Sequence, residues 1–286
     1  MVVAALTGGC FRPVFDGGTP STLSLPLPPM PSDAVAIEVC TFLLPESELA
    51  AAEACWGEID EQNLPAELRR RLAANGLRCG LIGGQVPAAW QKLLATSPAG
   101  EKPPPAAQPG QEATTRVDNG PANEIRLMQI RGGRPTEILT TPVRPQITLL
   151  ERVNDSLRGA RLTQAQGVLV TRVFPQGDGR ARLEIVPEVQ HGEPKQRFVG
   201  KDGVFQMENA RDRRRFEDLR MEMVLAPGQT LAIGSSSESK GVGDALFRER
   251  EQNPGRKVVL IRLAQTQYDD LFAPERVSAP VATSQD

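Results

Sequence analysis

The sequence has a single histidine, His191, and only four cysteines, Cys10, Cys40, Cys55 and Cys79. The cysteines lack the Cys-x-x-Cys spacing of metal-binding motifs, and one histidine does not complete a ligand set. His191 has no cysteine or serine partner near it in the sequence, which indicates a surface histidine rather than a catalytic base. We therefore predict no metal site, no cofactor and no catalytic residue, and we expect a protein that is not an enzyme.

Aromatic residues are also scarce, at 4% of the chain, and the net charge is only −2. Leu, Val, Ile and Ala must therefore build the cores, and the chain as a whole has no charge excess that would attract nucleic acid. Two arginine runs, 69–71 and 213–215, stand beside acidic residues. This pattern predicts ion-paired surfaces, and contact with phosphate or an anionic lipid is the alternative.

Three of the cysteines lie in apolar segments. Cys40 and Cys79 each fall in a strand-like run, and Cys55 lies on the apolar face of a short helix. Cysteine behaves as a small hydrophobic residue, so its place in apolar segments predicts buried, free thiols. A Cys40–Cys79 disulfide is the alternative, provided that the two strands adjoin and that the compartment is oxidising.

The first residues, Met1 to Cys10, form a short apolar run that ends in small residues and a cysteine. Such an ending is typical of bacterial lipoprotein signals, in which the cysteine becomes the lipidated first residue and acyl chains hold the protein at a membrane. No Lys or Arg precedes the run, and Thr7 stands where these signals carry an aliphatic residue. We predict lipidation of Cys10, with a plain disordered terminus as the equal alternative.

Proline-rich stretches divide the chain into segments, since such compositions are typical of linkers. We predict a signal remnant or tether, a small α/β domain, a Pro/Ala/Gly-rich linker, a β-rich domain and a flexible tail, at residues 1–32, 33–96, 97–123, 124–272 and 273–286. The fold class that we expect is α+β: a small βααβα sandwich followed by a mainly antiparallel β-sheet domain.

The predicted α/β domain alternates apolar strands with short helices. Its βααβα order comes from the segments Ala34–Leu44, Pro45–Trp56, Leu64–Ala74, Leu77–Ile82 and Val86–Leu94. Asn75-Gly76 suits a left-handed cap after the second helix. We expect the two strands to share one small sheet, with the helices over one of its faces.

The β-rich domain is predicted from apolar runs separated by turn sequences. Ile125–Ile130 and Thr136–Thr140 flank a Gly-Gly pair, which is typical of a hairpin. Val168–Phe174 and Ala181–Val189 flank a Gly-Asp-Gly turn and predict a second antiparallel hairpin with one buried and one wet face. Val258–Leu263 is almost wholly apolar, which predicts a central strand.

Several motifs follow one another between residues 167 and 264. The Gly-Asp-Gly turn leads to Leu183-Glu-Ile-Val-Pro-Glu-Val189, which precedes Gly228-Gln-Thr-Leu-Ala-Ile-Gly234 and then Ala245-Leu-Phe247. This order resembles the conserved C-terminal domain of bacterial secretins, the outer-membrane rings of type II and type III secretion. The resemblance implies a secretin-like β-module. It does not extend to membrane-spanning strands, because the wet face of the predicted hairpin carries Arg and Glu.

These observations favour a contact protein over a catalyst. Our leading hypothesis is a non-enzymatic structural or interaction protein of the bacterial cell envelope, anchored through Cys10, that presents its sheet edges to a protein partner. We expect no nucleic-acid partner and no bound cofactor. The alternative is a soluble, periplasmic or cytoplasmic module that binds a small ligand at the interface of the two predicted domains.

Overall fold

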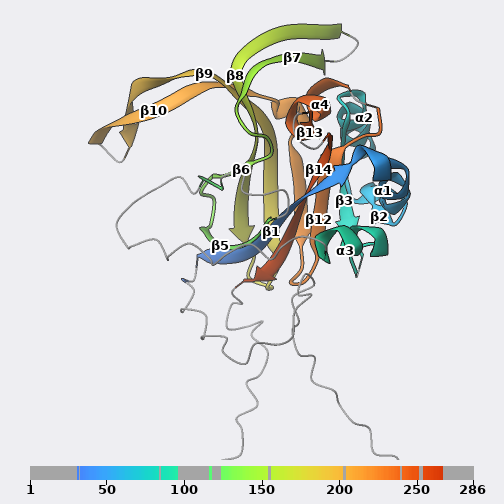
Figure 1. Cartoon of the computed structure of the whole chain (residues 1–286). Coiled ribbons are helices and arrows are strands. Elements are labelled where there is room, and N and C mark those ends of the chain that lie inside the picture. The colour runs from blue at the N-terminus through green and yellow to red at the C-terminus, as the bar shows by residue number, and fades with distance from the viewer. Residues whose placement is uncertain are drawn as a thin grey trace, which may run out of the picture.

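The computed structural model is mainly β, with 59% strand and 21% helix over the residues that it describes. It describes residues 31, 33–83, 85–95, 116–117, 124–153, 156–201, 204–238, 240–250 and 254–266. Two antiparallel sheets make up the body, and the second of them curls into a half-barrel (Figure 1). The four α-helices in the described part of the chain are short, and the longest of them, α2, has nine residues.

The first sheet has the strand order β2-β3-β12-β14-β1-β5, and β13 pairs with β14. All of its described pairings are antiparallel. Its strands β1, β2, β3, β5, β12, β13 and β14 comprise Ala34–Pro45, Ile59–Asp60, Leu77–Ile82, Glu124–Arg131, Thr230–Ser235, Arg248–Glu249 and Gly255–Gln265, respectively. The central position of β14 confirms the prediction drawn from its apolar run, because a strand buried on both faces needs no polar alternation.

The second sheet has the order β10-β9-β8-β6-β4, and β11 pairs with β9 while β7 pairs with β8. Its strands β4, β6, β7, β8, β9, β10 and β11 comprise Arg116–Val117, Thr136–Leu139, Arg144–Val153, Ser156–Pro175, Ala181–Lys201, Val204–Arg215 and Met221–Leu225, respectively. The predicted β8–β9 hairpin is confirmed: Pro175 pairs with Ala181, and Gly179 has a φ of 82° in the turn between them. Buried and half-exposed residues alternate over 181–185, as expected.

The main core lies between the two sheets. Val35, Ile37 and Val39 of β1 belong to the same buried cluster as Leu169 of β8 and Leu183 of β9. The opposite face of the first sheet is covered by two helices. Figure 1 shows these helices, α1 (Leu49–Trp56) and α3 (Ala88–Ala95), beside the sheet, and Trp90 packs there against both Phe42 and Trp56. The sandwich thus has a third, partial layer.

The predicted order of elements in residues 33–96 is found, but the expected sheet is not. The helix α2 (Ala66–Ala74) ends at Asn75-Gly76, and Gly76 has a φ of 72° as the cap prediction requires. However, β12 and β14 lie between β1 and β3, so the prediction that β1 and β3 share a small sheet of their own is wrong. The physical reason is burial: β1 is covered on both faces over nearly its whole length and takes a partner on each side.

The hairpin predicted across Gly132-Gly133 is also wrong, because β5 and β6 belong to different sheets. The two glycines carry the chain from one layer to the other. The Gly132 N–H donates to the carbonyl of Asp33, 2.7 Å away, and the Gly133 N–H donates to the carbonyl of Val173 at 2.8 Å. Gly133 has a φ of 73°, a conformation that suits glycine. Consecutive amides therefore fasten this turn to both sheets.

The three described cysteines are free and buried, and the Cys40–Cys79 disulfide alternative is excluded. Cys79 packs in the core between the sheets, whereas Cys40 packs on the helix-covered face. Burial, with a smaller effect of Glu38, raises the pKa of the Cys40 thiol to about 12. Burial also raises the pKa of Cys79. Neither thiol is activated as a nucleophile.

Candidate functional site: two β-arms and their supports

Two long strands, β8 and β9, lie partly in the second sheet and partly outside it, and so build two hairpin arms. The β8 strand pairs with β7 up to Ala165 and with β9 from Gln166 onward. The bend falls at Gln164, whose φ is 49°, an unusual value for a residue other than glycine. The β9 strand pairs with β8 only up to Gln190 and continues beyond it with β10 alone. Gly192, with a φ of 76°, follows this point and lies opposite a register shift in β10 between 210 and 212. Bends of this kind redirect a strand out of its sheet.

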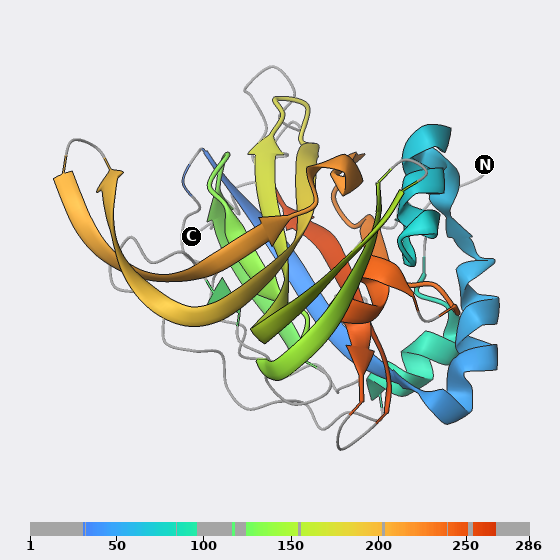
Figure 2. The same ribbon diagram turned by 90° about the horizontal axis from the view of Figure 1, so that it is seen from above.

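The β7–β8 arm, residues 144–153 and 156–165, folds back over the body. Its inward face carries Leu149 and Leu162, which are buried in the main core, and Ile147 and Ala160, which pack against it. Seen from above, this arm crosses over the sheets (Figure 2). Its outward face shows Leu150 and Leu157, exposed by 40% and 60%. This arm is a lid on the half-barrel.

Asn75 holds the open edge of the β7–β8 arm. Its side chain accepts a hydrogen bond from the Arg152 N–H at 2.8 Å and donates one to the Arg152 carbonyl at 3.0 Å. The amide therefore pairs with the backbone N–H and carbonyl of Arg152 as a residue of a neighbouring strand would. Asn75 is only 1% exposed. Sequence reasoning assigned Asn75 to a helix cap alone, because the partner lies 77 positions away.

A second element fits against the same corner. The helix α4 (Gly241–Phe247) begins where composition predicts a Ser/Gly-rich loop over 235–243. The Gly243 N–H donates to the Asn75 carbonyl at 2.9 Å. A Cβ on Gly243 would lie 1.8 Å from the Gly76 carbonyl oxygen, so only glycine permits this approach. The buried residues of α4, Phe247 among them, then join the main core.

The arginine run at the base of β10 is ion-paired, as predicted, and its partners come from distant strands. Arg215 pairs with Glu188 at 2.8 Å, and Arg213 lies 3.8 Å from the same carboxylate. On the other side, Arg214 pairs with Glu151 of β7. Because successive side chains of a strand point to opposite faces, the middle arginine contacts the β7–β8 arm and its two neighbours contact β9. The run thus joins the base of the β9–β10 arm to the outer end of the β7–β8 arm.

Glu188 is the buried member of this group, with no exposed side-chain surface. Arg213 also lies 3.3 Å from Glu137 of β6, whose side chain is 6% exposed. Buried carboxylates require such cationic partners. The structure indicates a structural role for the run, since its guanidinium groups contact carboxylates that are nearly or wholly covered.

The β9–β10 arm, residues 191–201 and 204–212, projects away from the body (Figures 1 and 2). Lys195 pairs with Asp212 at 3.0 Å across its base. His191 also pairs with Asp212 in the backbone ladder, and it is half-buried. Farther out, Met207 is 58% exposed. Among the described elements, β10 has β9 as its only ladder partner, so its outer edge is open.

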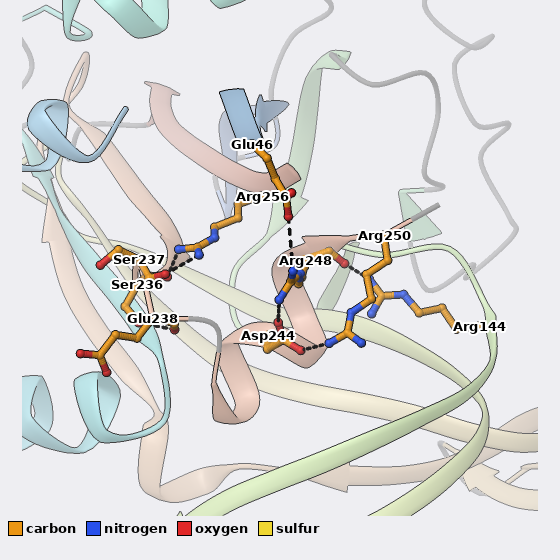
Figure 3. Close-up of polar contacts among 9 residues, drawn as sticks. All are labelled: Glu46, Arg144, Ser236, Ser237, Glu238, Asp244, Arg248, Arg250 and Arg256. Carbon is orange, nitrogen blue, oxygen red and sulfur yellow. Dashed lines mark hydrogen bonds and ion pairs between the residues drawn. The ribbon is translucent and has the colours of Figure 1, made fainter. Parts of the chain in front are cut away.

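A group of arginines surrounds the end of α4 and the short strand β13 (Figure 3). Arg248 lies 3.3 Å from Glu46 and 3.4 Å from Asp244. Arg250 reaches the same aspartate, and Arg144 donates to the carbonyl of Arg248. These contacts connect the turn that follows β1 with α4 and β7 at one corner.

Arg256 stabilises the loop before α4, because it donates to the carbonyl oxygens of Ser236 and Ser237 (Figure 3). The neighbouring Lys257 is largely buried and lies 3.8 Å from Glu249. Burial lowers the pKa of Lys257, and the charge of Arg144 lowers it further, whereas Glu249 opposes the shift. The cations of this corner thus face carboxylates or carbonyl oxygens of their own chain.

On the helix-covered face of the first sheet, Glu38 and Arg262 form a buried pair at 3.1 Å. Desolvation raises the pKa of Glu38, and the hydrogen bond and charge of Arg262 oppose that shift. Glu38 lies on β1 and Arg262 on β14, directly opposite each other in the ladder. The pair fixes this register, because a one-residue slip would bury an unpaired charge.

The one residue that sequence reasoning assigned a covalent role, Cys10, lies outside the described residues. In the described part of the chain, no group of three or more His, Cys, Asp or Glu side chains is placed to hold a metal ion. None of the described helices is long and apolar enough to cross a membrane. No protein-family model, no curated protein and no solved structure matches this chain.

Proposed function

We propose that this chain is a non-enzymatic structural or interaction protein of the bacterial cell envelope, and that the β9–β10 arm is its main contact element. The observation that carries the proposal is the shape of that arm: a hairpin of two long strands that leaves the body and keeps the outer edge of β10 open. Open edges and protruding hairpins bind partners by adding strands or by side-chain contacts.

The position of the two arms on the body supports this proposal. In Figure 1, β1 begins and β14 ends on the lower side of the body, whereas both arms lie on the upper side. The arms therefore lie on the side of the body opposite the start of β1, the first described strand after Cys10. The partner that we propose is a protein. A secretin-like β-module built on β8, β9 and β12 is part of the same proposal.

The arm is tested by replacing residues 192–211 with Asn-Gly, which closes β9 and β10 as a tight hairpin at His191 and Asp212. In cells, a photo-crosslinker at position 207 is expected to trap a protein partner in the membrane-associated fraction. The shortened variant is expected to keep its thermal stability and to lose the complex on size-exclusion chromatography. A matched control carries the crosslinker at position 224, where Val224 is 39% exposed on β11. Equal trapping at both positions contradicts the proposal.

The anchor is tested separately by intact-mass measurement of the protein extracted from membranes. A mass increase that Cys10→Ser abolishes supports lipidation. An unmodified, soluble product ends the anchored form of the proposal and leaves the arm experiment unaffected.

A further inference from the structure

The strand β5 forms the outer edge of the first sheet. It pairs with β1 from Ala34↔Arg131 to Thr41↔Glu124, and no other described strand pairs with it. Along β5, Met128 and Ile130 are buried in the core between the sheets. Ile125 and Leu127 point to the opposite face and are 46% and 52% exposed. An unpaired backbone edge and two large apolar side chains thus occur on one strand.

The helix layer stops before it reaches β5. The buried cluster under α1 and α3 includes Cys40, Phe42 and Leu44 of β1 and no residue of β5. The edge contains neither proline nor lysine, and Arg126 is its one charged residue on the face of Met128 between the ends of the strand. The β7 edge differs, because the Asn75 amide occupies its backbone groups at Arg152. The β5 edge therefore combines open pairing with two exposed apolar side chains, whereas the open β10 edge exposes Met207.

We propose that β5 binds an extended segment of another protein as an additional antiparallel strand. This site lies in the first sheet and does not depend on the β9–β10 arm. The antiparallel direction follows from the sheet itself, in which all described pairings are antiparallel. Main-chain hydrogen bonds supply affinity in such complexes, and alternate side chains supply specificity.

The side chains of β5 define what the segment carries. Leu127 and Ile125 require apolar residues opposite them, and Arg131, which is exposed on the same face, favours an acidic one. An antiparallel strand meets Arg131 first, then Gln129, then Leu127 and Ile125. From its N-terminus, the bound segment therefore carries an acidic residue, a polar residue and two apolar residues, spaced at every second position.

The test uses a fluorescein-labelled peptide, Ser-Glu-Thr-Gln-Thr-Val-Thr-Val-Thr, and the full-length protein in an anisotropy titration. Leu127→Asp is expected to weaken binding at least about tenfold, because it removes the apolar contact. Arg131→Glu is expected to weaken it about threefold, and a peptide with Lys in place of Glu restores it. Val224→Asp, a change at a similarly exposed apolar residue of the other sheet, serves as the control and leaves binding unchanged.

Two further peptides separate strand addition from adsorption. One has the same composition with its valines moved to the other face, and one carries N-methyl groups on the amides that would face β5. Both are expected to bind at least about tenfold more weakly. Equal binding of the N-methylated peptide, or no binding of the parent peptide, overturns the proposal. So does a concentration-dependent dimer that Leu127→Asp abolishes in sedimentation, because the occupant of β5 is then a second copy of this chain.

Discussion

The two arms are built alike and behave differently. Both are hairpins that include a strand lying partly in the second sheet, and these strands bend at Gln164 in β8 and at Gly192 in β9. The β7–β8 arm returns to the body and buries Leu149 and Leu162. The β9–β10 arm leaves the body and exposes Met207. The difference shows that strand length alone does not decide whether an arm packs.

What decides is the inward face and the contacts at the edge. Every second residue of the β7–β8 arm is apolar over Ile147, Leu149, Ala160 and Leu162, which gives it a face to bury. Its edge is then held by Asn75, and Glu151 pairs with Arg214. The described base of the β9–β10 arm has instead an exposed ion pair between Lys195 and Asp212, and such pairs contribute little. One arm is a stabilising lid, and the other is free for contact.

The largest expected effect on stability comes from a substitution in the β7–β8 arm, the lid. Leu149 has no exposed surface, so Leu149→Ala is expected to lower the free energy of unfolding by about 3 kcal/mol, from lost burial and the cavity left behind. Met207→Ala on the other arm is expected to change it by less than about 0.5 kcal/mol, because that side chain is 58% exposed. Urea unfolding followed by circular dichroism measures both. Similar losses for the two variants would mean that the arms pack alike.

A smaller effect concerns the edge contact of the lid. Asn75→Ala removes both hydrogen bonds to Arg152 and leaves that backbone pair without its partner, so a loss of about 2 kcal/mol is expected. Amide hydrogen exchange at Arg152 is expected to accelerate more than exchange in β14. Asn209→Ala, at an exposed position of the β9–β10 arm, is the matched control. Unchanged protection at Arg152 would show that packing alone holds the arm.

Local patterns predicted the strands well because their signals lie in neighbouring residues. The turn before Arg180, the alternation in the residues that follow it and the apolar run of β14 each specify an element without reference to the rest of the chain. The pairing of the strands was harder to predict from the sequence. The strands β1 and β14 are over 200 positions apart, and the residues around each strand do not indicate its partner. The same distance hid the contacts of Asn75 with Arg152 and of Arg214 with Glu151.

The smallest effect lies at the bends themselves. Gln164 adopts a positive φ that costs an ordinary residue about 1 kcal/mol, and glycine adopts it freely, at some cost in the entropy of the unfolded chain. Gln164→Gly is therefore expected to raise the free energy of unfolding by about 0.5 kcal/mol. The reverse change, Gly192→Ala, places a Cβ 3.7 Å from Asp212, an ordinary contact, so its expected loss of about 1 kcal/mol is conformational. Opposite signs in matched urea titrations show that both arms bend through the same backbone conformation. A destabilised Gln164→Gly variant would mean instead that the Gln164 side chain supports the lid, and the two arms would then differ at their bends as well as in their packing.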